Sequence, residues 1–284
     1  MVLVALAAMW GSSFMVIRVL VEELPPLTLT ATRVSIAATV LFLILAFKRE
    51  HLPKSLTLWG WCFAVGLCGT ALPFFLISWG EQRIEASTAS ILMSVMPLAT
   101  LILAHFFTAT DRITPQKLIG ILIGFCGVLV LVGPEAIKGL GGDVIYQIAT
   151  ACGALSYGVS TIIARNFPAS PLLSRTTAVM ICAAVQIIPL SLVLDHPWTL
   201  TPGTISIISV IYLGIFPTAL AGLVFFYLIA ARGPSFIAYV NYMIPVAGVG
   251  WGILLLNEEM TPSTILALVI ILMGVAIANY KQRT

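Results

Sequence analysis

Long apolar runs recur along the chain and are separated by short polar connections. A helix that crosses a bilayer needs roughly 20 mainly apolar residues. The expected spans are residues 2–20, 28–47, 58–79, 86–107, 117–133, 146–165, 171–194, 205–229, 236–255 and 263–280. Continuous runs such as residues 40–47 lack the alternation of apolar and polar residues that marks a barrel strand. The pattern predicts an all-α integral membrane protein with ten transmembrane helices.

The composition indicates that lipid surrounds much of the chain. Sixty per cent of the residues are hydrophobic and nine per cent are charged, whereas a soluble domain has roughly a quarter charged residues. The first span could also be a signal peptide, but it lacks a basic leader. No CxxC pair occurs, so we interpret the cysteines as packing residues: Cys62, Cys68, Cys126, Cys152 and Cys182.

The charges are divided unevenly between the two sides of the membrane. If the spans alternate from a cytoplasmic N-terminus, ten Lys and Arg residues fall on the side of the N-terminus and four on the other. Basic connections stay in the cytoplasm, so both termini are expected there. The basic side is a topology signal, and we expect no nucleic-acid partner.

The two halves of the chain resemble each other at an offset of 147 or 148 residues. Trp10-Gly11 corresponds to Tyr157-Gly158, and residues 69–72 (GTAL) correspond to residues 217–220 (PTAL). The predicted units are residues 1–134 and 144–281, each with five spans. Because five is odd, the second unit must enter the membrane from the opposite side. Inverted repeats of this kind are typical of secondary transporters.

Two Thr-Pro pairs, Thr114-Pro115 and Thr261-Pro262, are expected to start helices, because threonine can cap a helix and proline suits its first position. The acidic residues before them, such as Asp111 and Glu258, are expected near the positive helix ends. Gly120, Gly124 and Gly127 are expected to form a ridge for close helix contact.

Polar residues at helical spacing mark one face of the fourth and ninth spans. A proline near the middle of each span frees a carbonyl that lipid cannot satisfy, so this face should meet protein or a cavity. We interpret it as the lining of a substrate cavity, with tight helix packing as the alternative. The residues are Ser87, Ser90, Ser94 and Pro97 in one half, and Ser235, Tyr239, Tyr242 and Pro245 in the other.

Further aromatic and hydroxyl side chains occur on other spans. Together they would form an apolar cavity with a few hydroxyl donors, which suits a small organic ligand. The alternative for each aromatic residue is core packing or an interfacial belt. The candidates are Trp10 and Ser13, Thr70 and Phe74, Tyr157 and Thr161, and Thr218.

Arg33 lies more than one turn inside the second span. A charge within the membrane is a functional candidate, and this one could hold a substrate carboxylate or phosphate. It could equally reach to the interface or pair with Glu22 or Glu23. Its counterpart in the second half lies near Met180, so the charge is not repeated.

The sequence contains no HExxH, GxSxG or P-loop lysine motif, and its three histidines are far apart along the chain. Glu81, at the end of the third span, is interpreted as a loop residue. We therefore expect neither an enzyme nor a bound metal or cofactor.

Several motifs carry a resemblance to a known family. Trp10-Gly-Ser-Ser-Phe14 resembles the opening signature of the EamA branch of the drug/metabolite transporter superfamily, and Arg33-Val-Ser-Ile-Ala-Ala38 resembles its second-span pattern. The two later segments that resemble the family are Pro97 with Asp111-Arg-Ile-Thr114 and Gly120–Gly127, and Pro245 with Glu258-Glu-Met-Thr261 and Gly274. The family usually has glutamate in place of Asp111. The resemblance implies ten helices, two repeats and a central cavity.

The resemblance also implies a bacterial inner-membrane protein, since many relatives export amino acids or other metabolites there. We expect a secondary transporter that moves a small organic metabolite across the lipid bilayer by alternating access, with export of an amino acid or a related amphipathic compound favoured. The alternatives are a non-transporting sensor or partner subunit, because fold alone does not fix function, and a membrane-embedded enzyme.

Overall fold

The computed structural model describes residues 2–107, 113–132, 143–232 and 240–280, and helices dominate them. The first half contains α1 (Val2–Leu20), α2 (Pro26–Phe47), α3 (Leu56–Gly66), η1 (Leu67–Ala71), α4 (Leu72–Gly80), α5 (Ala86–Leu92), α6 (Val95–Phe107) and α7 (Pro115–Val132). The second half contains α8 (Val144–Arg165), α9 (Leu172–Leu194), η3 (Pro197–Thr199), α10 (Thr204–Leu213), η4 (Gly214–Leu220), α11 (Ala221–Arg232), α13 (Val240–Leu256) and α14 (Pro262–Asn279).

Eight helical segments are long and apolar enough to cross a membrane, and two shorter apolar helices follow them near the C-terminus. Each long segment overlaps an expected span, with ends that differ by a few residues. Many large apolar side chains, such as Phe47, Leu129 and Leu254, are exposed on the helix surfaces, where only lipid would solvate them. No strand occurs within the described ranges. The chain is therefore an all-α multi-pass membrane protein, as the hydropathy pattern predicts.

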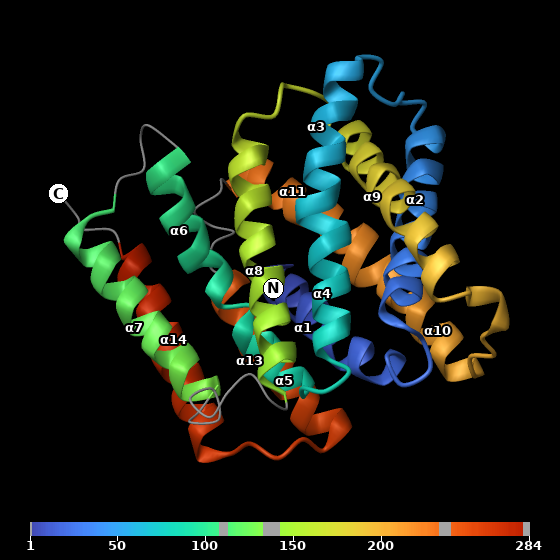
Figure 1. The fold of residues 1–284 in the computed structure, drawn as a ribbon. Coiled ribbons are helices and arrows are strands. Elements are labelled where there is room, and N and C mark those ends of the chain that lie inside the picture. The colour runs from blue at the N-terminus through green and yellow to red at the C-terminus, as the bar shows by residue number, and fades with distance from the viewer. Residues whose placement is uncertain (1, 108–112, 133–142, 233–239, 281–284) are drawn as a thin grey trace.

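The connections between helices gather at two ends of the molecule (Figure 1). Residues 21–25, 81–85, 195–203 and 257–261 lie in the lower part of the view, whereas residues 48–55 and 166–171 lie at the top. We call the lower end the acidic end, because its connections carry Glu22, Glu23, Glu81, Glu85, Asp195, Glu258 and Glu259.

Helices α7 and α14 begin at the two Thr-Pro pairs, as expected. The backbone N–H of Lys117 donates to Thr114 Oγ1 at 3.3 Å, and that of Thr264 donates to Thr261 Oγ1 at 3.2 Å. Both prolines sit at the first helical position, where no backbone donor is needed. The preceding acid Glu258 does not lie where it is expected, because it contacts the start of α5 rather than that of α14. Asp111 lies outside the described residues.

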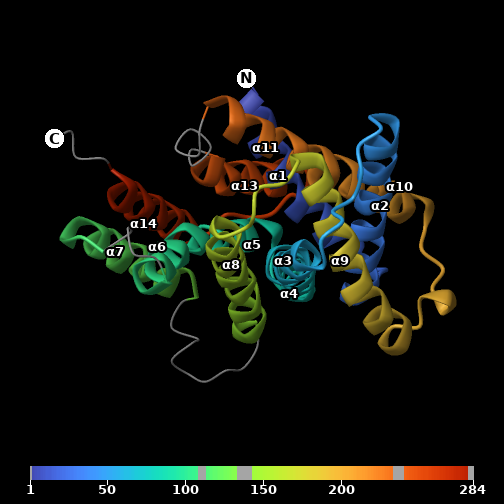
Figure 2. The same ribbon diagram turned by 90° about the horizontal axis from the view of Figure 1, so that it is seen from above.

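The glycine ridge of α7 packs against α14, as expected. A Cβ atom added at Gly120 would lie 2.5 Å from the backbone nitrogen of Ala278, and one at Gly127 would lie 2.9 Å from that of Ile271. These separations are too short for a side chain, so glycine lets the two backbones touch. Figure 2 places this pair at one edge of the molecule and α2, α9 and α10 at the opposite edge.

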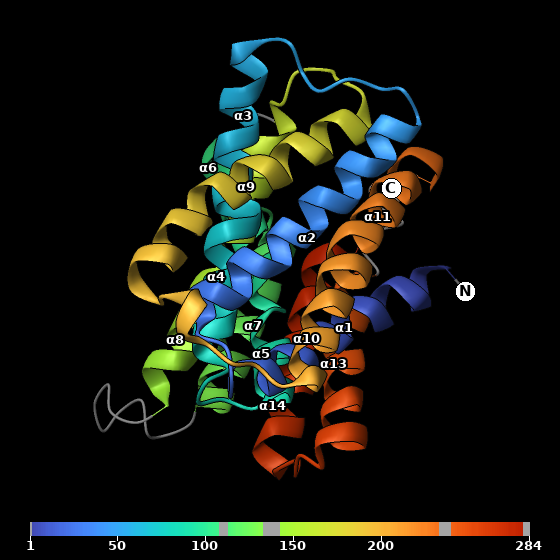
Figure 3. The ribbon, with the colours of Figure 1, turned by 90° about the vertical axis from the view of Figure 1, so that its right-hand side faces the viewer.

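Two of the spans contain a π-helical segment near their middle, η1 and η4. A proline interrupts the α-helical ladder in each case, Pro217 within η4 and Pro73 just after η1, and π segments are one way to absorb the missing donor. η4 packs on α2 and η1 packs on α9. Figure 3 shows α2 running between α9 on one side and α10 with α11 on the other.

Candidate functional site

Arg33 is buried in the middle of α2, with 5 % of its surface exposed. Its Nε atom donates to Thr218 Oγ1 of η4 at 2.8 Å. Its guanidinium carbon lies 3.7 Å from the centroid of the Phe74 ring, close enough for a cation–π contact. The only salt bridge among the described residues joins Arg18 to Glu22 at 3.4 Å. Arg33 is therefore a cation inside the protein that no carboxylate pairs within this part of the chain.

The other two interpretations of Arg33 are wrong. Its side chain is 5 % exposed and contacts Phe74 and Thr218 inside the protein, so it is not extended along the surface towards an interface. Glu22 pairs with Arg18, and Glu23 accepts a hydrogen bond from the backbone N–H of Gly203 at 2.7 Å.

Thr218 and Tyr157 lie close to Arg33, and Trp10 contacts the residue before Thr218. Thr218 donates its hydroxyl proton to the carbonyl of Leu213 at 2.7 Å, which leaves its oxygen lone pairs for the arginine. Trp10 donates its indole N–H to the carbonyl of Pro217 at 3.0 Å, so α1 also meets η4. The Tyr157 ring meets Phe74 edge-on, with centroids 6.5 Å apart. We call Trp10, Arg33, Phe74, Tyr157 and Thr218 the arginine cluster.

The serine face of the fourth span is tightly packed at Ser90. The hydroxyl of Ser90 donates to the carbonyl of Ser87 at 2.8 Å and lies 3.4 Å from the carbonyl of Pro245. A Cβ atom added at Gly248 would collide with the Ser90 side chain. At this residue the structure favours helix packing between α5 and α13 over a cavity wall.

The remaining candidates of the two proline-containing spans are divided between different helix pairs. Ser94 lies between α5 and α6, and its buried hydroxyl has no hydrogen-bond partner among the described residues. Pro97 occupies the first turn of α6, which packs against α8, whereas Pro245 lies inside α13, which packs against α1 and α5. Tyr239 and the side chain of Tyr242 lie outside the described residues.

Two candidates form local contacts, and a third is buried. Ser13 lies 3.5 Å from the carbonyl of Met9, and Thr161 donates to that of Tyr157 at 2.9 Å, so each bonds within its own helix. Thr70 is buried in η1, with 2 % of its surface exposed. None of these contacts by itself identifies a ligand.

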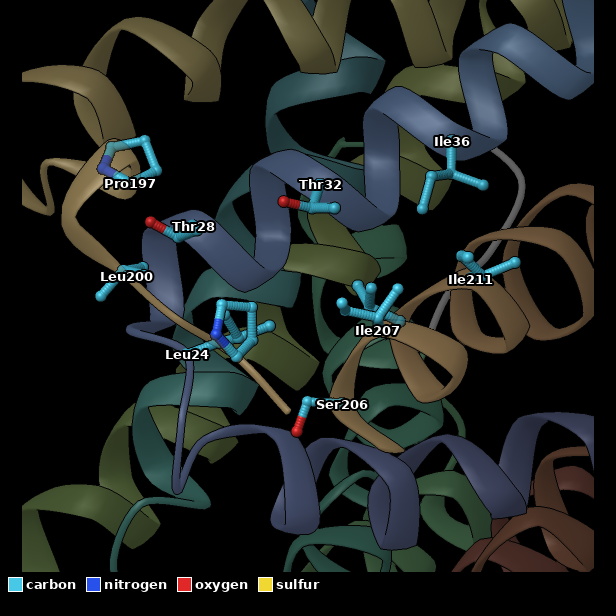
Figure 4. Close-up of a pocket in the computed structure, with 11 residues that line it drawn as sticks. Leu24, Thr28, Thr32, Ile36, Pro197, Leu200, Ser206, Ile207 and Ile211 are labelled. Carbon is cyan, nitrogen blue, oxygen red and sulfur yellow. The ribbon is translucent and has the colours of Figure 1, made fainter. Parts of the chain in front are cut away.

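A separate groove of about 310 Å³ runs between α2 and α10 (Figure 4). Thr28, Thr32 and Ile36 line it from one face of α2, and Ile207 and Ile211 line it from α10. Its surface is mainly apolar, and Arg33 is not among the residues that line it. The groove and the arginine cluster are therefore on different faces of α2.

At the acidic end, three carboxylates each accept a backbone N–H from an element far away in sequence. Glu258 accepts from Ala86 at 2.7 Å and from Ser87 at 3.0 Å. Asp195 accepts from Thr28 at 2.7 Å, and Glu23 accepts from Gly203 at 2.7 Å. The hydrogen bond from Gly203, and a second from Ser206, lower the pKa of Glu23. These contacts place negative charge at the starts of α5, α2 and α10, where helix dipoles favour it.

Glu81, which the sequence analysis takes for a loop residue, is fully buried. Neither of its carboxylate oxygens has a hydrogen-bond partner in the part of the chain that the structure describes. Burial raises the pKa of this carboxyl well above its usual range. The sequence offers one indication that Glu81 could be buried, because this residue directly follows a 25-residue apolar span.

Comparison with known proteins identifies the family of this chain. The model of the EamA-like transporter family matches residues 1–133 and 144–280. An uncharacterized transporter of Archaeoglobus fulgidus is 28% identical over 99% of this chain and 98% of its own length. The uncharacterized inner membrane transporter YedA of Escherichia coli is 26% identical over 98% of this chain and 89% of its own length.

Two other proteins extend this picture. A probable amino-acid metabolite efflux pump of Escherichia coli is 26% identical over 96% of this chain and 92% of its own length. One solved crystal structure has the same fold, with a TM-score of 0.70, 20% identity and coverage of 97% of this chain and 94% of the other. The family model covers most of both halves, and the chain belongs to the EamA-like transporter family.

Proposed function

We propose that this protein is a secondary transporter that exports a small organic metabolite bearing a carboxylate, with an amino acid or a related amphipathic compound favoured. The observation that carries the proposal is the burial of the Arg33 charge without a carboxylate partner among the described residues. Its charge is buried against Phe74 and Thr218, and no described carboxylate forms a salt bridge with it.

The chemistry of the guanidinium group favours a carboxylate as its partner. A buried charge without a counter-ion is costly, so a ligand that supplies one gains affinity at this position. Arginine binds carboxylates through a planar fork of N–H donors. Phe74, Tyr157 and Trp10 add the apolar surface that an amphipathic metabolite would contact.

The proposed mechanism is alternating access by two inverted five-helix repeats, residues 1–134 and 144–281. In secondary transporters of this design the two repeats rock around a site near the middle of the membrane. The offset of 147 or 148 residues between the halves and the family match to both halves support the repeat. We place both termini in the cytoplasm of a bacterial cell and the acidic end outside, on the basis of the charge distribution.

The names of relatives support the class of substrate. The similar protein from Escherichia coli is called a probable amino-acid metabolite efflux pump, and YedA is called an inner membrane transporter. We therefore assign this chain the same direction, from the cytoplasm outwards, and the same broad class of cargo.

The experiment is counterflow in liposomes that contain the purified protein. The vesicles are loaded with a mixture of unlabelled amino acids and organic acids, and the uptake of isotope-labelled compounds is followed by mass spectrometry. At least one compound with a carboxylate should accumulate above the level in empty liposomes, and its amide or ester analogue should not. Uptake of no compound, or equal uptake of the uncharged analogue, would overturn the proposal.

A further inference from the structure

Glu81 is enclosed at the junction of α4 and α8. It directly follows Gly80, the last residue of α4, and its backbone N–H donates to the carbonyl of Ile77 at 2.9 Å. A Cβ atom at Gly80 would lie 2.9 Å from the carbonyl of Tyr146 in α8, so the two helices touch beside Glu81. The side chain is 0 % exposed, and its two oxygens make no hydrogen bond with any described residue.

A carboxyl group in this position holds its proton more tightly than a carboxyl group in water does. An ionised carboxylate needs water or hydrogen-bond donors, and burial removes the first while the described surroundings do not supply the second. The charged groups that act on it are Glu258 from the connection before α14, Arg18 from α1 and Arg33 from α2. Glu258 adds to the effect of burial in raising the pKa of Glu81, and the two arginines oppose it.

The neighbouring Glu258 joins two distant parts of the acidic end. Its two carboxylate oxygens accept the backbone N–H groups of Ala86 and Ser87, which lie more than 170 residues earlier in the chain. A Cβ atom at Gly252 would collide with the Glu258 carboxylate, so this side chain also lies against α13. Glu258 therefore holds α5 and α13 together at this end.

A negative charge on Glu81 would act directly on this contact. Glu81 is fully buried and Glu258 is half-buried, so a charge on Glu81 would repel Glu258 through a medium that screens charge less than water does. The repulsion would weaken the hold of Glu258 on α5, and separation of the helices would admit water to Glu81. Loss of the proton and opening of the acidic end would then favour each other.

We propose that Glu81 is a proton-binding site, and that release of its proton to water accompanies opening of the acidic end. The site binds one proton in the closed state, and deprotonation leaves a hydrated carboxylate and a hydronium ion. If the protein is the transporter proposed above, this step links the movement of the metabolite to that of a proton. The binding of the proton itself does not depend on that function.

Infrared spectroscopy of the full chain in lipid vesicles tests the proton site. The carbonyl stretch of a protonated carboxyl should persist in the wild type to a higher pH than a solvated glutamate allows. Glu81→Gln should abolish this band. Glu259→Gln is the matched control, because Glu259 is an exposed carboxyl at the same end of the molecule, and it should leave the band in place. If Glu81→Gln does not fold, Glu81→Asp should shift the frequency of the band.

Hydrogen–deuterium exchange at the amides of Ala86 and Ser87 tests the link to opening. We compare variants at the same pH, so that the intrinsic exchange rate cancels. Above the pH at which the infrared band is lost, the wild type and Glu259→Gln should exchange several-fold faster than Glu81→Gln, and below that pH all three should agree. Equal exchange at every pH would overturn the coupling, and a band that survives in Glu81→Gln would overturn the site.

Counterflow separates this inference from the proposed function. Counterflow that is present, together with net uptake into empty vesicles that does not respond to an imposed pH gradient, overturns the coupling to flux and leaves the transport function intact. Absence of flux for every compound, with the infrared and exchange results as expected, overturns the proposed function and leaves the proton site intact.

Discussion

The two π-helical segments resemble each other in backbone and differ in chemistry. Gly66 precedes η1 and lies against the backbone of α9 at Val179, while Gly214 begins η4 and lies against the backbone of α2 at Arg33. Beside η4, α2 contributes Arg33, which donates to Thr218. Beside η1, α9 contributes Met180, which packs into the apolar cluster around Ala71 and Ala183. The same close helix contact thus serves as framework in both places, and Arg33 makes only one of them the proposed binding site.

The largest effect is expected from Arg33→Met, because this variant removes the charge that distinguishes the surroundings of η4 from those of η1. Loss of a buried charge that pairs with a ligand typically costs about 2–5 kcal/mol, so the apparent affinity for the transported carboxylate should fall at least ~30-fold. The melting temperature should stay the same or rise, because an unpaired buried cation is replaced by an apolar side chain. Counterflow and thermal unfolding of the purified protein measure the two effects.

The matched control for this variant is Met180→Leu, which conserves volume and charge on the other side and should transport normally. Arg33→Lys should recover part of the affinity, because it restores the charge without the planar fork. Normal transport by Arg33→Met would place the substrate elsewhere in the molecule.

A smaller change at the same place is Thr218→Val, which removes the hydroxyl that accepts from Arg33. Hydrogen bonds to charged groups contribute about 1.5–3 kcal/mol, so we expect the apparent affinity to fall by about tenfold or more. Thr70→Val makes the same substitution in η1, at a hydroxyl to which Arg33 donates no hydrogen bond in the described structure, and should change affinity by less than about twofold. Comparable losses in the two variants would show that the segments contribute alike.

The smallest effect is expected at the carboxylates that hold α2 and α10 at the acidic end. Backbone donation from Gly203 lowers the pKa of the exposed Glu23, so its contribution to stability is present above the unfolded pKa and is lost as the pH falls through the folded pKa. Glu23→Gln should therefore melt slightly below the wild type at neutral pH, and the two curves should converge in acid. A difference that grows with falling pH would contradict the assigned sign.

Much of the fold is predictable from the sequence because it depends on local patterns. Apolar length determines where the helices lie, the Thr-Pro pairs start α7 and α14, and glycines at helical spacing mark the face on which α7 meets α14. Arg33 is a candidate for a similarly local reason, since a charge inside an apolar run is costly without a role.

The geometry of the site depends on residues that are far apart in the chain. The contact from Arg33 to Thr218 spans 185 positions, and the contact from Glu258 to Ala86 spans 172, so no local pattern announces either one. The burial of Glu81 was missed because a residue at the end of a span is usually hydrated, and only the packing of α4 on α8 removes that water. The π segments were missed because hydropathy does not distinguish one kind of helix from another.

The glycine contacts between α7 and α14 affect how the protein is made as much as how it works. Because the two backbones meet without intervening side chains, α7 has no complete partner until α14, which is synthesised after it, has entered the membrane. Until then a strip of bare backbone on α7 faces lipid, which packs against it less well than a complementary helix does. Entry of α14 into the membrane is therefore the step that seals this edge of the molecule.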